Sequence, residues 1–274
     1  MSRAGAVLRW AALVVAAALF LLPFYLLIRN GLATREEITS PQWTFLPAEL
    51  HWENVSALFA GTEVPFARSL LNSAVVAVLQ TAGELLLCSA AGYGLARIPY
   101  RHSGKALGVV VATLLVPTSV TFVPSFVLVS SLGWLSDLRG LVVPGLFSAL
   151  NTVLFRQFFL DFPGELEDAG RIDGLGRWGV FRRIVLPNST GFLAAIAAIT
   201  FIGSWNSFLW PLVIAQDSSS WTVQVALSGL LTAQNPQLNL LFAAAAISIL
   251  PIVLLFVGLQ RYLVRGVTET GVNG

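Results

Sequence analysis

Long apolar stretches separated by short polar ones run along this chain. Six are long enough for membrane-spanning helices, because crossing the hydrocarbon core of a bilayer takes about 20 residues. They lie at about residues 10–28, 70–96, 106–131, 140–160, 191–215 and 240–263. The first exceeds the apolar core of a cleaved signal peptide, about 7–15 residues, so we expect it to be retained. The pattern predicts an all-α membrane protein with six spans, forming a single domain over residues 1–274.

Some positions modify this picture locally. The apolar stretch Trp221–Leu231 is too short to cross, and we expect it to lie at the surface or dip partway into the membrane. Pro117, Pro124 and Pro251 fall within predicted spans, where proline kinks a helix. Small residues in the stretch CSAAGYGLA, residues 88–96, would let two helices approach closely.

The basic residues give the orientation. If the N-terminus is cytoplasmic, twelve of the 16 Lys and Arg residues fall in segments on the cytoplasmic side. The other side holds Arg29, Arg35, Arg68 and Arg139. Cytoplasmic loops of membrane proteins carry the excess of Lys and Arg, so this bias predicts that both termini are cytoplasmic. The loop between the fourth and fifth spans, residues 161–187, is then cytoplasmic as well.

Composition supports a membrane protein. Charged residues make up 11% of the chain and hydrophobic residues 56%, whereas soluble domains carry about 25% charged residues. The net charge of +2 gives no argument for a nucleic-acid partner. The only cysteine, Cys88, cannot form an intrachain disulfide or a cysteine metal cluster, and its apolar neighbours favour a buried hydrophobe.

The cytoplasmic loop contains the one dense group of charges, ELEDAGRIDG at residues 165–174. Acidic residues after Pro163 suit the first turns of a helix, and Gly174 suits its end. Leu166, Ala169 and Ile172 form a narrow apolar stripe on this helix. A second short helix should follow and end at Pro187. Such an element suits a groove on a soluble partner, or alternatively the lipid headgroups.

The stretch PGELEDAGRIDGLGRWGVFRRIVLP, residues 163–187, resembles the cytoplasmic loop of ABC-importer permeases, most closely those of the maltose-type carbohydrate class. The family pattern of Glu-Ala-Ala, three residues, Gly, then Phe and Ile-x-Leu-Pro is met with departures. Asp168 stands for the usual Glu, Gly170 for the second Ala, and Leu175 for a small residue. WENVSALF, AAGYGLAR, SWNSFLWPL and the C-terminal segment 260–274 are also similar to the family, so the resemblance runs from about residue 50 to the end.

The resemblance implies that this loop couples the spans to a separate ATPase subunit. The residues expected to carry this role are Glu167, Asp168, Ala169, Gly170, Asp173, Gly174 and Phe181. It also implies a second homologous permease, an extracytoplasmic solute-binding protein and a carbohydrate solute in a bacterial cytoplasmic membrane. The only Gly-Lys pair, Gly104-Lys105, lacks the rest of the ATP-binding G-x-x-x-x-G-K-[ST] pattern, so ATP would be bound by the partner and the chain itself needs no cofactor.

Two other function classes fit less well. A secondary transporter or channel subunit commonly places paired ionisable groups within its spans, and here only Glu84 lies deep in one. An intramembrane enzyme would need a catalytic or metal-binding set, but His51 and His102 both lie in loops and no acid pair is present. The sequence therefore offers no catalytic residue and no metal ligand.

Four residues are candidates for a solute path: Glu84, Asn151, Trp205 and Asn206. Glu84 should face the interior of the helix bundle, either as a contact for the solute or as a structural lock to a neighbouring span. Trp205 and Asn206 suit sugar binding by stacking and amide hydrogen bonds, and equally suit helix packing. The solute itself is not encoded in any residue pattern, although the scarcity of basic residues disfavours a polyanion.

Overall fold

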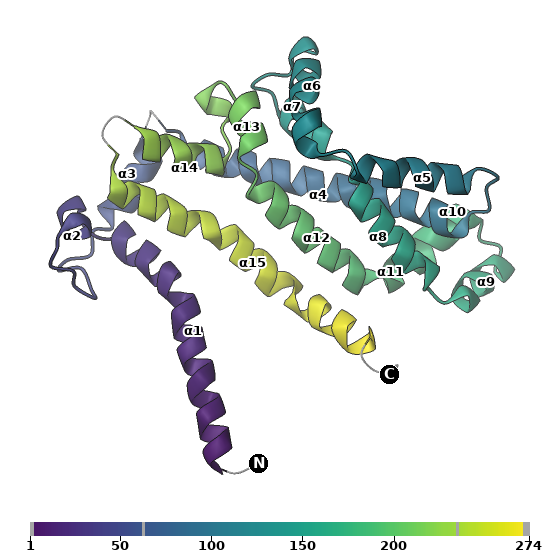
Figure 1. The fold of residues 1–274 in the computed structure, drawn as a ribbon, viewed down its shortest axis with the longest axis horizontal. Helices are drawn as coiled ribbons and strands as arrows, with labels where there is room; N and C mark the ends of the chain where they lie inside the picture. Colours follow the sequence, from purple (N-terminus) through teal and green to yellow (C-terminus); the bar gives the residue numbers. More distant parts are fainter. Residues whose placement is uncertain (1–2, 62–63, 234–235, 271–274) are drawn as a thin grey trace. The chain divides into compact units, whose positions relative to one another are not determined.

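The structure, a computed structural model, describes residues 3–61, 64–233 and 236–270, and helix is the only regular secondary structure there (Figure 1). The helices are α1 Arg3–Gly31, α2 Arg35–Thr39, α3 Glu53–Ala60, α4 Phe66–Arg97, α5 Ser103–Leu114, α6 Thr118–Ser131, α7 Leu138–Val142, α8 Ala149–Leu160, α9 Gly164–Ile172, α10 Arg177–Val180, α11 Leu186–Asn188, α12 Thr190–Trp205, α13 Leu209–Ile214, α14 Val223–Thr232 and α15 Leu238–Thr270. Short 3₁₀ turns lie at Val143–Gly145 and Ser218–Ser220, and a π-helical turn at Phe181–Val185. The all-helical prediction is confirmed.

Three helices are continuous and long enough to cross a membrane, within α1, α4 and α15. Three more apolar pairs pass the same test only together, because each is bent at a break: α5 with α6 by 95°, Leu138–Gly145 with α8 by 40°, and Arg177–Asn188 with α12 by 79°. The described residues thus provide three to six spans. The number of six spans stays a prediction. The cytoplasmic location of the termini stays a prediction too, and residues 1–2 and 271–274 lie outside the described residues.

Two of the predicted spans are interrupted by breaks in the helix that their apolar length did not predict. The third predicted span, residues 106–131, divides at Pro117, which precedes α6 in an extended conformation. Proline cannot continue the helix before it, because its ring disfavours the α conformation of the preceding residue. The fifth, residues 191–215, divides after Trp205 at Asn206, and α13 begins only at Leu209. The stretch 221–231 forms the short helix α14, as its length predicts.

The chain forms two compact units, Met1–Leu70 with Val223–Pro251, and Leu71–Thr222 with Ile252–Gly274. In the first unit, Gly31 at the end of α1 packs on the backbone of α15, where an added Cβ would lie 2.8 Å from the Cα of Ala243. Asn54 of α3 donates its amide to the carbonyl oxygens of Gly31 and Ala33, both at 3.0 Å. These buried hydrogen bonds hold the loop after α1 against α3.

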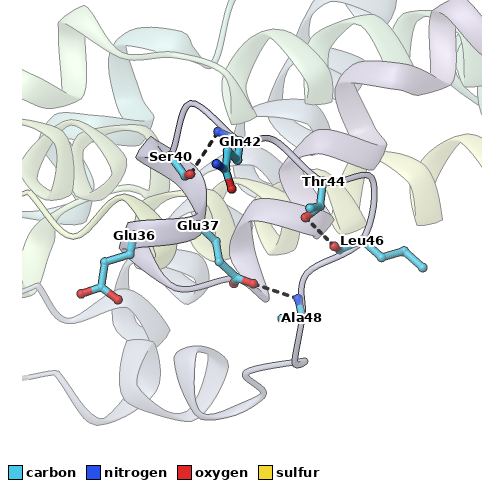
Figure 2. A pocket seen from close by; sticks show the side chains of 7 residues that line it. All are labelled: Glu36, Glu37, Ser40, Gln42, Thr44, Leu46 and Ala48. Carbon is cyan, nitrogen blue, oxygen red and sulfur yellow. Dashed lines mark hydrogen bonds between the residues drawn. The ribbon is translucent and has the colours of Figure 1, made fainter.

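The loop between α2 and α3 in this unit is organised by Glu37 (Figure 2). Its carboxylate accepts the backbone N–H of Thr34 at 3.0 Å and of Ala48 at 2.8 Å, and the Thr34 side chain accepts the N–H of Glu37 in return. These two backbone donors hold the pKa of the Glu37 carboxyl below its ordinary value. The pKa of His51 shifts in the opposite direction: hydrogen bonding to the Glu53 carboxylate, 2.6 Å away, raises it above its ordinary value.

The second unit has an aromatic core where α4, α8, α12 and the π-helical turn meet. Its buried members are Cys88, Tyr93, Phe155, Phe159, Phe162, Val180, Phe181, Val185 and Ile196. Gly92 allows α4 to approach α8, since a Cβ there would lie 2.6 Å from the Cβ of Phe155 and 2.8 Å from the backbone nitrogen of Arg156. This close approach confirms the packing role predicted for the small residues of α4, and Cys88 is fully buried as predicted.

Candidate functional site

The charged stretch of the loop folds as α9, with two acidic residues in its first turn and Arg171 in its last, as the helix dipole favours. Gly174 follows with a φ of +83°, which only glycine adopts without strain. Its N–H donates to the carbonyl of Arg171 at 3.0 Å, and the N–H of Leu175 donates to the carbonyl of Gly170 at 2.9 Å. This pair of bonds is a Schellman motif, so the predicted helix end at Gly174 is confirmed.

The two faces of α9 differ in what they contact. Asp168, Ala169 and Ile172 are exposed, and Ile172 keeps 87% of its surface accessible. Asp168 pairs only along the helix, with Arg171 at 2.9 Å. Glu167 and Gly170 are instead buried against the rest of the unit. The predicted apolar stripe is therefore an outward surface, flanked by charge and open to a partner.

The second half of the loop is built into the core. Phe181 is buried, with its ring 4.8 Å from that of Tyr93 and 5.3 Å from that of Trp178. Pro187 does not end the helical run as predicted, because α11 continues to Asn188. Ser189 stands at the N-cap position of α12, but its hydroxyl donates to the carbonyl of Val185 at 2.7 Å and accepts no N–H of α12. The helical run 177–188 meets α12 at a bend of 79°.

The structure places the sequence-predicted loop residues in two groups. Asp168, Ala169, Asp173 and Gly174 are exposed, whereas Glu167, Gly170 and Phe181 are buried. An added Cβ on Gly170 would overlap the terminal methyl of Ile184 on the π-helical turn, so that side chain would have to shift. Figure 1 shows α9 and α10 beside the C-terminal ends of α4 and α8.

A polar cleft of about 250 Å³ lies between α4, α8 and α12. Glu84 of α4 accepts hydrogen bonds from the Asn151 amide and, at 3.5 Å, from the Thr200 hydroxyl. The same Asn151 amide donates to Thr200 at 3.2 Å. The expectation that Glu84 faces the interior is met, and Asn151 is its partner.

Two further polar residues line the cleft one turn along. Ser204 donates to the side-chain oxygen of Gln80 at 2.5 Å, and Gln80 donates to the carbonyl of Leu141 at 2.9 Å. Gln80 and Glu84 are four residues apart on α4, as Thr200 and Ser204 are on α12, so each pair shares one helix face. This repeat of polar residues in apolar helices is the signal by which the sequence could have revealed them.

Trp205 and Asn206 are not among the residues that line this cleft. Trp205 is 2% exposed and stacks on Phe201 at 5.9 Å, so packing is the better description of its role. Asn206 is the C-terminal cap of α12, where its backbone N–H bonds to Ile202 and Ser204. The structure therefore joins Glu84 with Asn151 but leaves Trp205 and Asn206 at a helix end.

Comparison with known proteins identifies this arrangement. Residues 89–269 match the family of binding-protein-dependent transport system inner membrane components. The chain is 31% identical over 264 residues to the sn-glycerol-3-phosphate transport system permease protein UgpE of Yersinia pestis bv. Antiqua, covering 94% of each chain. It is 33% identical over 251 residues to the arabinooligosaccharides transport system permease protein AraQ of Halalkalibacterium halodurans, covering 90% of this chain and 85% of that one.

A solved structure has the same fold. It is a chain of a bacterial ABC transporter involved in the import of the acidic polysaccharide alginate, with a TM-score of 0.83 and 19% identity over 96% of this chain and 98% of that one. This match shows that the two chains share a fold. The chain belongs to the family of binding-protein-dependent transport system inner membrane components, as a permease subunit of an ABC importer.

Proposed function

We propose that this permease forms half of the translocation path for a sugar or sugar derivative, within a single transmembrane domain of six spans and two cytoplasmic termini. A second homologous permease forms the other half, an extracytoplasmic solute-binding protein delivers the solute, and two ATPase subunits on the cytoplasmic side bind and hydrolyse ATP. Residues 163–187 couple this chain to one of them. The permease itself binds no cofactor.

The exposed face of α9 carries the coupling part of the proposal. A helix with an uncovered apolar stripe of Leu166, Ala169 and Ile172, fixed at its end by a Schellman motif, is the form in which helices enter a groove on a partner. The lipid-headgroup alternative fits less well, because Glu165 and Asp168 are also exposed and the inner leaflet is negative. Asp168, Ala169, Asp173 and Gly174 are then the residues nearest the ATPase.

The polar cleft supports the solute part of the proposal. Amide, hydroxyl and carboxylate groups from three helices converge there in otherwise apolar surroundings, as in sites that recognise small polar molecules. Glu84 is the only ionisable side chain that lines it among the described residues, and no Lys, Arg or His of that part of the chain pairs with it. A neutral or amine-bearing sugar suits this cleft better than a phosphate or a uronate.

The family excludes the alternatives considered from the sequence. A secondary transporter or channel subunit would work without an ATPase, whereas this family supplies membrane components to binding-protein-dependent systems. The relatives' solutes differ, with glycerol 3-phosphate in one name and arabinooligosaccharides in another, so the individual sugar is left to experiment.

Uptake by the purified complex tests the function. We expect proteoliposomes that contain both permeases, the ATPase and the solute-binding protein to accumulate a neutral or amino sugar only when ATP is enclosed with the ATPase. Vesicles with a Walker-A-inactivated ATPase are the matched control. Equal accumulation without ATP, along a solute or ion gradient, would contradict the proposal and restore the secondary-transporter alternative.

Cysteine labelling tests the proposed topology. The native chain is a clean background because its only cysteine, Cys88, is 0% exposed. We expect Ala60→Cys and Leu231→Cys to react with a membrane-impermeant maleimide added outside intact cells, since both positions are exposed. Ile172→Cys, 87% exposed in the chain alone, should react only in inside-out vesicles from cells that lack the ATPase subunit, because the proposed docking would cover this position. Reaction of Ile172→Cys from outside would overturn the orientation.

A further inference from the structure

We propose that Glu167 does not face the ATPase but anchors α9 to the end of α4, so that movement of the coupling helix is passed to the helix that lines the solute cleft. This inference rests on the proposed docking of residues 163–187. The anchor consists of Glu167, Tyr93 and Arg97. Glu167 is at least 70 residues away in the chain from the other two, which lie one turn apart on α4.

The carboxylate of Glu167 is 2% exposed and makes three contacts. Its Oε2 accepts the Tyr93 hydroxyl at 3.1 Å and Arg171 Nη2 at 3.4 Å. Its Oε1 lies 3.2 Å from Arg97 Nε but accepts no hydrogen bond from the described residues, because that N–H points at the carbonyl of Phe159, 2.7 Å away. The attraction between Glu167 and Arg97 is therefore electrostatic, without a hydrogen bond between these two atoms.

Arg97 joins three elements. It is the last residue of α4, and its guanidinium donates to the carbonyls of Phe159 and Phe162 at the C-terminal end of α8. A cation at that end completes the backbone bonds that the helix leaves open and matches the negative pole of its dipole. The same group holds the carboxylate of α9, so α4, α8 and α9 are joined at one point.

Tyr93 adds a second connection one turn earlier on α4. It is 4% exposed, and its ring packs 5.8 Å from Phe159 and 4.8 Å from Phe181. Tyr93 thus contacts α9 through its hydroxyl and the second half of the loop through its ring. The neighbouring residues Glu167 and Asp168 face opposite ways on α9. The Glu167 side chain is buried in the anchor, whereas the Asp168 side chain is 68% exposed.

The position of the anchor on α4 gives it a functional consequence. Glu84 lies nine residues before Tyr93 on the same helix, about 14 Å along the axis at 1.5 Å per residue. The helix is continuous between them, so a displacement of α9 that pulls on Tyr93 and Arg97 also displaces Gln80 and Glu84 in the cleft. The anchor is thereby a positioning device for the transport step.

Tyr93→Phe is the sharpest test, since it removes only the hydroxyl. We expect the variant complex to assemble, to keep its ATPase subunit and to hydrolyse ATP, while solute uptake per ATP falls about tenfold or more, the weight of one hydrogen bond to a charged group. Glu167→Gln should act in the same direction, and the double variant should lose less than the product of the two effects. Tyr100→Phe, at an exposed tyrosine between α4 and α5, is the matched control.

The outcomes separate this inference from the proposed function. If the wild-type complex shows no ATP-driven uptake, the proposed function itself is rejected. Wild-type coupling together with an unchanged uptake-to-ATP ratio in both Tyr93→Phe and Glu167→Gln would reject the anchor. A loss confined to yield or thermal stability, with the ratio per assembled complex intact, would also overturn it, because a structural contact alone changes no ratio.

Discussion

Replacing Gly174 with proline is expected to abolish solute-stimulated ATP hydrolysis and leave the permease in the membrane. Proline holds φ near −65°, whereas Gly174 has a φ of +83°. Proline also lacks the N–H that Gly174 donates to Arg171. The end of α9 cannot then close, and its outward face no longer matches a groove. We expect stimulated hydrolysis in proteoliposomes to fall about tenfold or more, as the loss of roughly 1.4 kcal/mol of docking energy would produce.

Gly176 provides the matched control for this substitution. It lies two residues further on, has a φ of −70°, and an added Cβ would meet nothing within 4 Å. Gly176→Ala should therefore keep wild-type stimulation. Gly174→Ala should fall between the two, because an L-residue in the left-handed region costs roughly 1–2 kcal/mol.

Asp168→Lys examines the docking face without disturbing the helix end. It reverses an exposed charge and replaces the ion pair with Arg171 by repulsion. We expect the ATPase subunit to be lost on co-purification, in contrast to Tyr93→Phe, which should retain it. Wild-type stimulation in both Gly174→Pro and Asp168→Lys would remove the docking role of residues 163–187.

The local signals of the coupling loop were sufficient to predict α9. Acidic residues early in α9, Gly174 at its end and the apolar stripe all act within a few residues, and the structure confirms them. The direction in which Glu167 faces was not accessible from sequence. Its partner Tyr93 is 74 residues away, so only tertiary packing decides that Glu167 turns inward and Asp168 outward.

The spans show the same division between local and long-range information. Apolar length located the continuous helices α1, α4 and α15, but the third and fifth stretches carry no charge to mark their breaks. At the fifth break the polar pair Asn206 and Ser207 was a usable signal, although Asn206 was interpreted as a candidate for the solute path instead. Glu84 and Asn151 were identified singly, while their meeting with Thr200 required three helices to be placed together.

Glu84→Gln should reduce uptake of an amine-bearing sugar about tenfold more than uptake of the neutral parent sugar. Glutamine keeps the shape and an acceptor for Thr200, but it lacks the charge that strengthens a hydrogen bond to an ammonium group by roughly 1–1.5 kcal/mol. The measurement is competition between the two sugars in proteoliposomes, normalised to assembled complex. Assembly and basal ATP hydrolysis should survive.

Glu84→Leu distinguishes this solute contact from a structural lock. Leucine leaves the Asn151 amide without its carboxylate partner, so we expect a lower melting temperature of the complex in detergent, whichever sugar is present. Thr81→Val is the matched control, since Thr81 lies on α4 near the cleft, its hydroxyl has no hydrogen-bond partner among the described residues, and it does not line the cleft. If Glu84→Gln lowers uptake of both sugars equally and Glu84→Leu loses stability, then Glu84 ties α8 and α12 to α4 and does not contact the solute.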